Sequence, residues 1–182
     1  MHNYLPKYFT FIEEFDKEFL KKLDRKIAII YRNSKNINKI DILKKLKIYC
    51  RQKKTKLYIA NDFKLARKLD CDGLYISAHN KKLYKYNINI KIKFNVIGSA
   101  HSLDEILIKK KQGTKLIFLS PLFFNKKNNK YLGISKFNLL SNISRSKIIA
   151  LGGINNTNIK KLNMINSCGF AAISLYKNKI TL

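Results

Sequence analysis

The stretch IIALGGINNTNIKKL, residues 148–162, joins a continuous apolar run to two glycines and then to polar residues with helical spacing. Such an apolar run is typical of a β-strand that is buried on both faces. Gly152 and Gly153 let the backbone approach a neighbouring group more closely than a Cβ atom would permit. Asn155 and Asn156 are suited to cap a helix over 159–165. The stretch therefore predicts a strand, a turn and a helix. A diglycine turn is more often a plain tight connection, and its alternative role is to bind a phosphate group.

The same order of strand and helix recurs along the chain. Eight short apolar or β-branched runs predict strands at 8–12, 27–31, 57–60, 74–77, 94–98, 116–120, 148–151 and 171–175. Amphipathic patterns between most of them predict helices at 15–23, 40–49, 63–69, 103–110, 134–140 and 159–165. Ser102 and Glu105 form the pattern of a capping box at the fourth of these helices. The segment between the fourth and fifth strands is short, so we expect at most a turn of helix there.

Eight nearly continuous apolar strands that alternate with helices favour a parallel sheet covered by helices, and the count favours a closed (β/α)8 TIM barrel. We expect residues 1–182 to form one such domain. Because these barrels usually contain about 250 residues, this chain must have short loops and a truncated last helix. An open doubly wound sheet is the alternative, but it would not normally need eight strands in so short a chain.

The composition is strongly basic. The chain has 38 Lys and Arg residues against 11 Asp and Glu residues, and its formal net charge is +27. These lysines are scattered along nearly every segment, whereas a nucleic-acid-binding protein concentrates its charge on one face or arm. The scatter favours a general drift in composition over a nucleic-acid partner, although the excess charge would still attract small anions.

The cysteines and the apolar segments indicate the compartment. Cys50, Cys71 and Cys168 have unrelated spacings, which suits reduced thiols rather than disulfides or a metal site. No apolar stretch approaches the length of a membrane span, and the first residues lack the apolar core of a secretion signal. We therefore expect a cytoplasmic protein that does not enter a membrane.

Polar residues and glycines follow the predicted strands. In a parallel barrel, all strands end at one rim, and the loops of that rim form the active site. The candidates there are Arg32, Asn61, Asp62, His79, Asn80, Ser99, His101, Ser120, the loop NKKNNK (125–130), Gly152 and Gly153, with Ser174 inside the last predicted strand. A rim with a cation, a carboxylate, hydroxyls and amide donors is chemically suited to phosphate esters.

Four segments resemble a known family when they are taken in order. They are YIANDFKLARKLDCDGLYIS (58–77), GSAHS (98–102), LGGI (151–154) and GFAAIS (169–174), and they resemble the thiamine phosphate synthase and TenI family of (β/α)8 barrels. The resemblance runs from about Arg32 to Ser174. It implies condensation of hydroxymethylpyrimidine diphosphate with thiazole phosphate, with release of pyrophosphate and with Mg²⁺ stabilising the departing charge. It also implies that the diglycine turn lies against a substrate phosphate.

The resemblance implies roles for individual residues. Arg32 matches the arginine that contacts the diphosphate, and it is one expected catalytic residue. Asn61 and Asp62 match an Asn-Asp pair, of which the asparagine faces the substrate and the aspartate binds magnesium. The positions that match anion-binding or substrate-facing residues are Ser99, Gly152, Gly153 and Ser174.

The chain also departs from the family pattern. Ile30 and Ser34 stand where the family has a glutamine and a lysine, and Asn80 stands where it has a second magnesium aspartate. An amide in place of a carboxylate removes a full negative charge, so the affinity for Mg²⁺ should fall. The family's Thr-x-Thr-Lys corresponds to residues 125–128, and its contact with pyrophosphate would pass to a lysine of this loop, Lys126, Lys127 or Lys130.

Three functions remain open at this point. The leading one is thiamine phosphate synthesis, with a small phosphorylated heterocycle and pyrophosphate as ligands. The second is a metal-independent thiazole tautomerase of the TenI type, in which His101 transfers a proton. The third is a barrel that binds a phosphorylated ligand without catalysis. Structural roles are also available, since Asp62 could cap the next helix and His101 could bond to a loop carbonyl.

Overall fold

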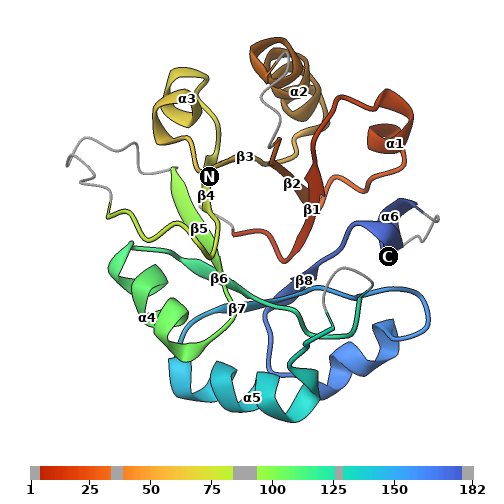
Figure 1. Ribbon diagram of the computed structural model, residues 1–182. Coiled ribbons are helices and arrows are strands. Elements are labelled where there is room, and N and C mark those ends of the chain that lie inside the picture. The colour runs from red at the N-terminus through yellow and green to blue at the C-terminus, as the bar shows by residue number, and fades with distance from the viewer. Residues whose placement is uncertain (1–4, 34–38, 84–93, 126–128, 178–182) are drawn as a thin grey trace.

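The computed structural model describes residues 5–33, 39–83, 94–125 and 129–177. Within these ranges eight strands form a closed barrel in chain order, and all neighbouring strands are parallel (Figure 1). The strands are β1 (Tyr8–Ile12), β2 (Ile27–Tyr31), β3 (Leu57–Ala60), β4 (Gly73–Ile76), β5 (Asn95–Ala100), β6 (Leu116–Leu119), β7 (Ile148–Leu151) and β8 (Gly169–Ala171). The TIM-barrel fold that the sequence predicts is confirmed.

Helices surround the barrel (Figure 1). They are α1 (Lys17–Lys21), α2 (Lys39–Lys53), α3 (Phe63–Lys68), α4 (Leu103–Lys111), α5 (Gly133–Ser144), the 3₁₀ helix η1 (Ile159–Met164) and α6 (Ser174–Lys177). In the described part of the chain α6 has four residues, as expected of a truncated last helix. The turn expected between β4 and β5 falls largely on residues 84–93, outside the described residues. None of the helices in the described ranges combines the length and the apolar character needed to cross a membrane.

Short polar side chains begin three of the helices. Asp16 Oδ1 accepts a hydrogen bond from the Phe19 amide at 3.0 Å at the start of α1. Ser102 Oγ accepts one from the Glu105 amide at 3.3 Å at the start of α4. Asp62 begins α3 in the same way. Each bond satisfies an amide at the helix start that has no acceptor within the helix.

Pairing of β8 with β1 closes the barrel. Tyr8 lies opposite Phe170 and Phe9 lies opposite Ala171 in this ladder. The Phe170 amide donates to the Lys7 carbonyl at 2.9 Å. A Cβ atom on Gly169 would collide with that carbonyl, so the closing strand must begin with glycine.

Side chains from the strands fill the barrel interior. The inward-facing cluster consists of Phe9, Phe11, Ala28, Ile30, Tyr58, Tyr75, Ile97, Leu116, Phe118, Ile149 and Ala171. Its aromatic rings meet edge to face, with centroids 4.8 Å apart for Phe9 and Phe118 and 5.3 Å apart for Phe11 and Tyr75. Since these rings occupy the interior, a ligand can enter only at the ends of the barrel.

The last predicted strand was misplaced. We expected a strand over 171–175, but β8 covers Gly169–Ala171, and Ser174 is the first residue of α6 rather than part of a strand. The apolar run AAISL predicts a strand at 171–175, but the pairing of β8 with β1 depends on Gly169, which precedes this run. The strand therefore starts and ends earlier than hydrophobicity alone indicates.

The segment after the diglycine also differs from the prediction. Residues 159–164 form a 3₁₀ helix instead of an α-helix. Ile159, Leu162 and Ile165 pack partly buried against the core, and their spacing of three residues is the period of a 3₁₀ helix. The expected cap is wrong as well, because Asn155 Oδ1 accepts the Thr157 amide at 2.9 Å and Asn158 directly precedes η1.

The interior aromatic cluster should dominate stability. Replacement of Phe118, which is fully buried, with Ala should lower the free energy of unfolding by about 3–5 kcal/mol, because it leaves a cavity among the remaining rings. Phe124→Ala is the matched control, since Phe124 is 56% exposed, and its cost should stay below about 1 kcal/mol. Denaturant unfolding measures both values, and equal losses would contradict this account of the core.

Candidate functional site

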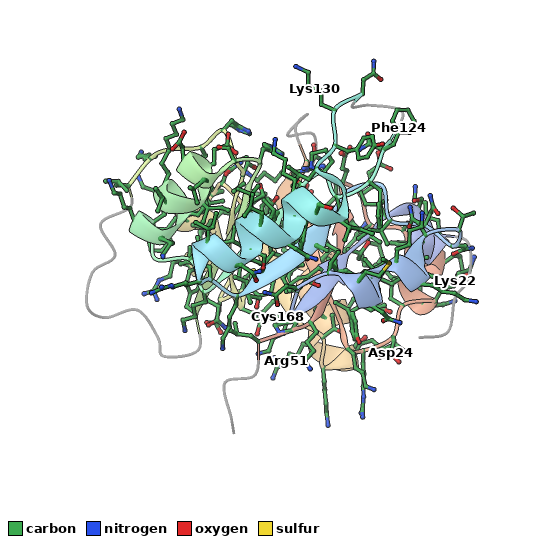
Figure 2. The ribbon with its side chains drawn as sticks, turned by 90° about the horizontal axis from the view of Figure 1, so that it is seen from below. Lys22, Asp24, Arg51, Phe124, Lys130 and Cys168 are labelled. Atoms are coloured by element: carbon green, nitrogen blue, oxygen red, sulfur yellow. The ribbon has the colours of Figure 1, made fainter. Side chains whose placement is uncertain are left out.

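The carboxyl ends of the strands meet at one end of the barrel. Figure 2 shows Phe124, which follows β6, and Lys130 at this end, and it shows Arg51 and Cys168 at the opposite end. A cavity of about 400 Å³ opens at this rim beside the ends of β2, β3 and β4. Its walls are formed by Tyr31, Arg32, Asn33, Lys39, Ala60, Asn61, Asp62, Ser77 and His79. We refer to this space as the mouth cavity.

Arg32 directly follows β2 and carries an exposed side chain into the mouth cavity. Its backbone amide donates to the Ile12 carbonyl at 2.9 Å. The guanidinium carbon lies 4.8 Å from the centre of the Phe11 ring, a distance at which a cation is attracted to an aromatic face. Among the described residues Arg32 forms no ion pair, so the positive charge remains available to an anion.

Asn61 ties the end of β3 to the end of β4. Its backbone adopts a left-handed conformation with φ of 58°. Its side chain accepts from the Ser77 amide at 2.9 Å and donates to the Ser77 hydroxyl at 2.7 Å. The Asn80 amide group also donates to Asn61 Oδ1, at 3.2 Å. Asn61 therefore fixes the polar wall of the mouth cavity.

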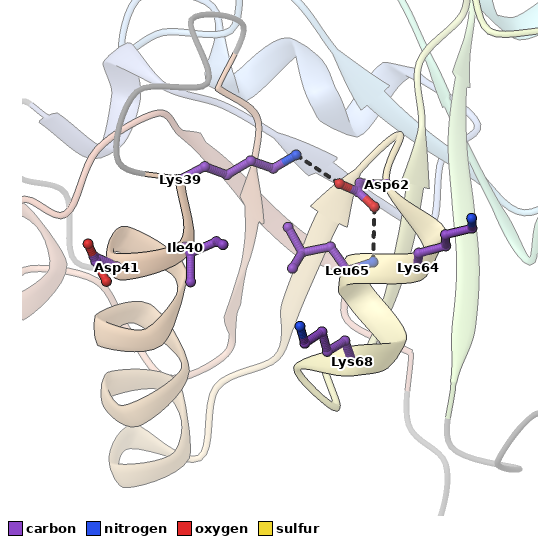
Figure 3. A pocket seen from close by; sticks show the side chains of 7 residues that line it. All are labelled: Lys39, Ile40, Asp41, Asp62, Lys64, Leu65 and Lys68. Carbon is purple, nitrogen blue, oxygen red and sulfur yellow. Dashed lines mark hydrogen bonds and ion pairs between the residues drawn. The ribbon is translucent and has the colours of Figure 1, made fainter.

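Asp62 is engaged by two donors. Its Oδ1 accepts from the Leu65 amide at 2.9 Å, which makes it the N-cap of α3, and its Oδ2 forms an ion pair with Lys39 Nζ at 2.9 Å. Figure 3 shows both bonds, with Lys39 reaching across from α2. Burial opposes ionisation, but the hydrogen bonds from Lys39 and Leu65 outweigh it and hold the pKa of Asp62 below its ordinary value. The structural role foreseen for Asp62 is therefore present.

Asp62 and Asn80, the expected metal ligands, do not fit a magnesium site. Both carboxylate oxygens of Asp62 accept hydrogen bonds, one of them from a cation. The Asn80 amide nitrogen donates to Asn61, and its oxygen accepts the Lys82 amide at 3.0 Å. No cluster of three or more His, Cys, Asp or Glu side chains that could hold a metal occurs in the part of the chain that the structure describes. A single carboxylate that already binds an ammonium group is a poor donor set for Mg²⁺.

His101 lies on the same rim but outside the walls of the mouth cavity. Glu105 Oε2 accepts from its backbone amide at 2.6 Å, so the backward bond of the capping box goes to His101 instead of Ser102. The ring nitrogen Nδ1 lies 2.7 Å from the Ser120 carbonyl oxygen. Because a carbonyl can only accept, Nδ1 holds the proton of the neutral ring, and Nε2 is the basic nitrogen.

Ser99 and Ser174 lie apart from the mouth cavity. Ser99 is buried within β5 and hydrogen-bonds with Tyr75. Burial raises the pKa of the Tyr75 phenol, and this hydrogen bond opposes the shift. Ser174 is exposed at the start of α6. The expected pyrophosphate ligands Lys126 and Lys127 lie outside the described residues.

The diglycine packs against the segment that follows β6. Gly152 and Gly153 have φ angles of 95° and 72°, a region that side chains disfavour. A Cβ atom on Gly152 would lie 2.8 Å from the Pro121 Cβ, and one on Gly153 would lie 2.6 Å from the Phe124 carbonyl oxygen. The close approach inferred from the sequence therefore exists, and the neighbouring group in the structure is the loop after β6.

Lys109 of α4 is fully buried beneath the loop after β4. Its ammonium group donates to the carbonyls of Ser77 and Asn80, each at 2.8 Å, and to Gln112 Oε1 at 2.9 Å. Gln112 in turn donates to the Asn80 carbonyl at 2.9 Å. This cluster holds the loop that carries the polar wall of the mouth cavity.

Sequence reasoning missed both Lys39 and Lys109. Lys109 shares the buried face of its helix with Ile106, three residues earlier, and this spacing was the available signal. Lys39 begins α2 and follows no strand directly, so the sequence carried no signal for its place at the rim.

The family model described as thiamine monophosphate synthase, TMP-TENI, matches residues 13–175. The chain belongs to this family. A thiamine-phosphate synthase from Pelagibacter ubique is 32% identical over 145 residues, which cover 78% of this chain and 69% of that protein. A putative thiamine-phosphate synthase 2 from Aquifex aeolicus is 26% identical over 172 residues, or 92% of this chain and 90% of that one. The family is typically dependent on Mg²⁺.

Solved structures support the fold of the family. A thiamine phosphate pyrophosphorylase from Pyrococcus furiosus superimposes with a TM-score of 0.71 and covers 92% of this chain and 86% of its own. The sequence identity over this superposition is 18%. The similarity shows that this chain shares the barrel architecture of that protein.

The packing of the diglycine gives a test with an internal control. Gly153→Ala should lower the free energy of unfolding by roughly 3 kcal/mol, because it adds a backbone collision to the cost of a left-handed alanine. Gly133 has a similar φ of 68° but open space around it, so Gly133→Ala should cost only about 1 kcal/mol. Denaturant unfolding of the two variants measures the difference, and equal costs would refute the collision.

Burial of Lys109 predicts a pH dependence of stability. Desolvation lowers the pKa of Lys109 from 10.5 to about 8. Between these values the unfolded chain binds a proton that the folded protein does not, so the stability should rise with pH. The unfolding free energy of the wild type, minus that of Lys109→Met, should therefore increase from about pH 8 toward pH 10.5. A difference that stays constant over this range would show that Lys109 keeps an ordinary pKa.

Proposed function

We propose that this protein is a transferase that forms thiamine phosphate from hydroxymethylpyrimidine diphosphate and thiazole phosphate, with release of pyrophosphate. Membership of the thiamine monophosphate synthase family supports this reaction class. The proposal rests chiefly on the guanidinium of Arg32, which forms no ion pair within the described residues and lies over Phe11 at the wall of the mouth cavity. A fixed cation at this point is suited to bind a diphosphate and to stabilise the charge that develops as pyrophosphate leaves.

The remaining walls of the mouth cavity would orient the substrates. Asn61 and Ser77 form a hydrogen-bonded wall, which is held in place from behind by the Asn80 side chain and by Lys109. Such a preorganised wall lowers the entropy cost of bringing the two substrates into the orientation in which they react. Ser99, Gly152, Gly153 and Ser174 stay predictions as phosphate or substrate contacts. The bulk of the barrel interior is filled, so the chemistry is confined to the rim.

A thiazole tautomerase is the second candidate, and the geometry of His101 favours it. The Ser120 carbonyl fixes the proton on Nδ1, which leaves Nε2 as a base that can accept a proton from a bound heterocycle. This histidine lies outside the walls of the mouth cavity, whereas Arg32 lines them. The position of Arg32 is the reason that we place synthesis before tautomerisation.

Small phosphorylated molecules are the expected ligands, and nucleic acid is not an expected partner. The described ion pairs and lysines are spread over several elements, among them α1, α2 and α3, which does not form the single basic face of a nucleic-acid-binding protein. The cytoplasmic location expected from the sequence stays a prediction.

Formation of thiamine phosphate from the two purified substrates tests the proposal. The wild type should form the product, and Arg32→Ala should lower kcat/KM by about 100- to 1,000-fold, because the leaving pyrophosphate loses a fixed charge. Arg51→Ala removes the same charge at the opposite end of the barrel and should leave kcat/KM unchanged (Figure 2). The assay is run both with Mg²⁺ and in EDTA.

The same protein is then given a phosphorylated thiazole tautomer as a tautomerase substrate. Interconversion of the thiazole tautomers without any thiamine phosphate formation would contradict the synthase proposal and support the second candidate. Loss of that interconversion in a His101→Ala variant would assign the proton transfer to His101.

A further inference from the structure

The ion pair between Lys39 and Asp62 stands at the place where a metal ligand was expected. Lys39 Nζ and Asp62 Oδ2 are 2.9 Å apart, and the side chains are 22% and 34% exposed. Both residues line the mouth cavity, together with Arg32. Among the described residues that line this cavity, Lys39 and Arg32 are cations and Asp62 is the one carboxylate, and His79 also lies there.

We propose that Lys39 takes the place of a divalent cation at this rim, so that Lys39 and Arg32 bind the pyrophosphate group without added metal. The identity of the anion rests on the proposed function. The proposed function leaves open which residue binds the pyrophosphate beside Arg32 and whether a metal ion is required, and the inference concerns these two points.

The ammonium group of Lys39 is suited to this role. It carries several N–H donors, and the bond to Asp62 uses one of them, so others can turn toward a phosphate oxygen. Asp62 neutralises part of its charge and fixes its position, while the Leu65 amide holds the carboxylate from the other side. The pair therefore forms a preorganised cation at the edge of the mouth cavity.

A divalent cation would meet repulsion at the same position. Mg²⁺ bound to Asp62 would lie beside the ammonium of Lys39 and close to the wall that carries Arg32. The nearby side chain of Asn80 supplies an amide in place of the negative charge that would offset this repulsion. An anion such as pyrophosphate is attracted by the same arrangement.

Lys39 also lines a second cavity, which contains a control residue for Lys39. A groove of about 650 Å³ lies between α2 and α3 on the outer side of the pair, lined by Lys39, Ile40, Asp41, Asp62, Lys64, Leu65 and Lys68 (Figure 3). Lys68 belongs to this groove and not to the mouth cavity. Substitution of Lys68 therefore removes one positive charge nearby without changing the mouth cavity.

Titration calorimetry with inorganic pyrophosphate in the presence of EDTA tests the inference. The wild type should bind pyrophosphate without metal, and Lys39→Met should weaken the affinity by on the order of 10-fold, the usual effect of losing a charged hydrogen bond. Lys68→Met should bind like the wild type, and Lys39→Arg should retain most of the affinity because it keeps the charge. The melting temperature of each variant without ligand confirms that it is folded.

Two results would overturn the inference. One is binding by the wild type only after Mg²⁺ is added, which needs no variant and would show that the site requires a metal. The other is an equal loss in Lys39→Met and Lys68→Met, which would show a diffuse attraction by net charge.

The inference and the proposed function can fail separately. Binding of pyrophosphate in EDTA without formation of thiamine phosphate would contradict the proposed function and support the role of Lys39. Formation of thiamine phosphate only with Mg²⁺, with no binding of pyrophosphate in EDTA, would support the proposed function and overturn the role of Lys39.

Discussion

Closure of the barrel between β1 and β8 is the constraint on which the rest of this structure depends. It requires Gly169, because the closing strand runs against the Lys7 carbonyl, and it brings the carboxyl ends of all eight strands to one rim. The interior is then occupied by aromatic side chains such as Phe9, Phe118 and Tyr75. Because side chains fill the centre, only the rim is open to a ligand. The polar residues at the strand ends lie around this rim, where barrels of this kind carry their active sites.

The charge at the rim follows from residues that come from different elements. Arg32 is placed by the end of β2, Asp62 by the start of α3, and Lys39 by the start of α2. Lys109 stabilises the facing loop from beneath with a buried charge whose hydrogen bonds all go to neutral oxygens. The result is a rim with fixed positive charge and a rigid amide wall, which suits the binding of an anion better than the binding of a metal ion.

The sequence predicted the barrel well because its signal is distributed over many residues. Apolar runs marked strands β1, β2, β3 and β7 with the observed ends, whereas β8 was misplaced because its position depends on one glycine beside another strand. The place of Arg32, Asn61 and Asp62 at the rim was predictable because these residues come within two positions of a strand end. Lys39 was missed because its place at the rim arises from its ion pair with Asp62, a tertiary contact that leaves no local pattern in the sequence.

A crystal structure of the protein soaked with pyrophosphate and Mg²⁺ together would show directly whether Lys39 replaces a metal ion at the rim. We expect the anion to lie in the mouth cavity between the guanidinium of Arg32 and the ammonium of Lys39, and the ion pair of Lys39 with Asp62 to remain intact. Density for a metal ion bound to Asp62, with Lys39 displaced from the carboxylate, would contradict it. So would an anion that lies in the groove beside Lys68 and leaves the mouth cavity empty.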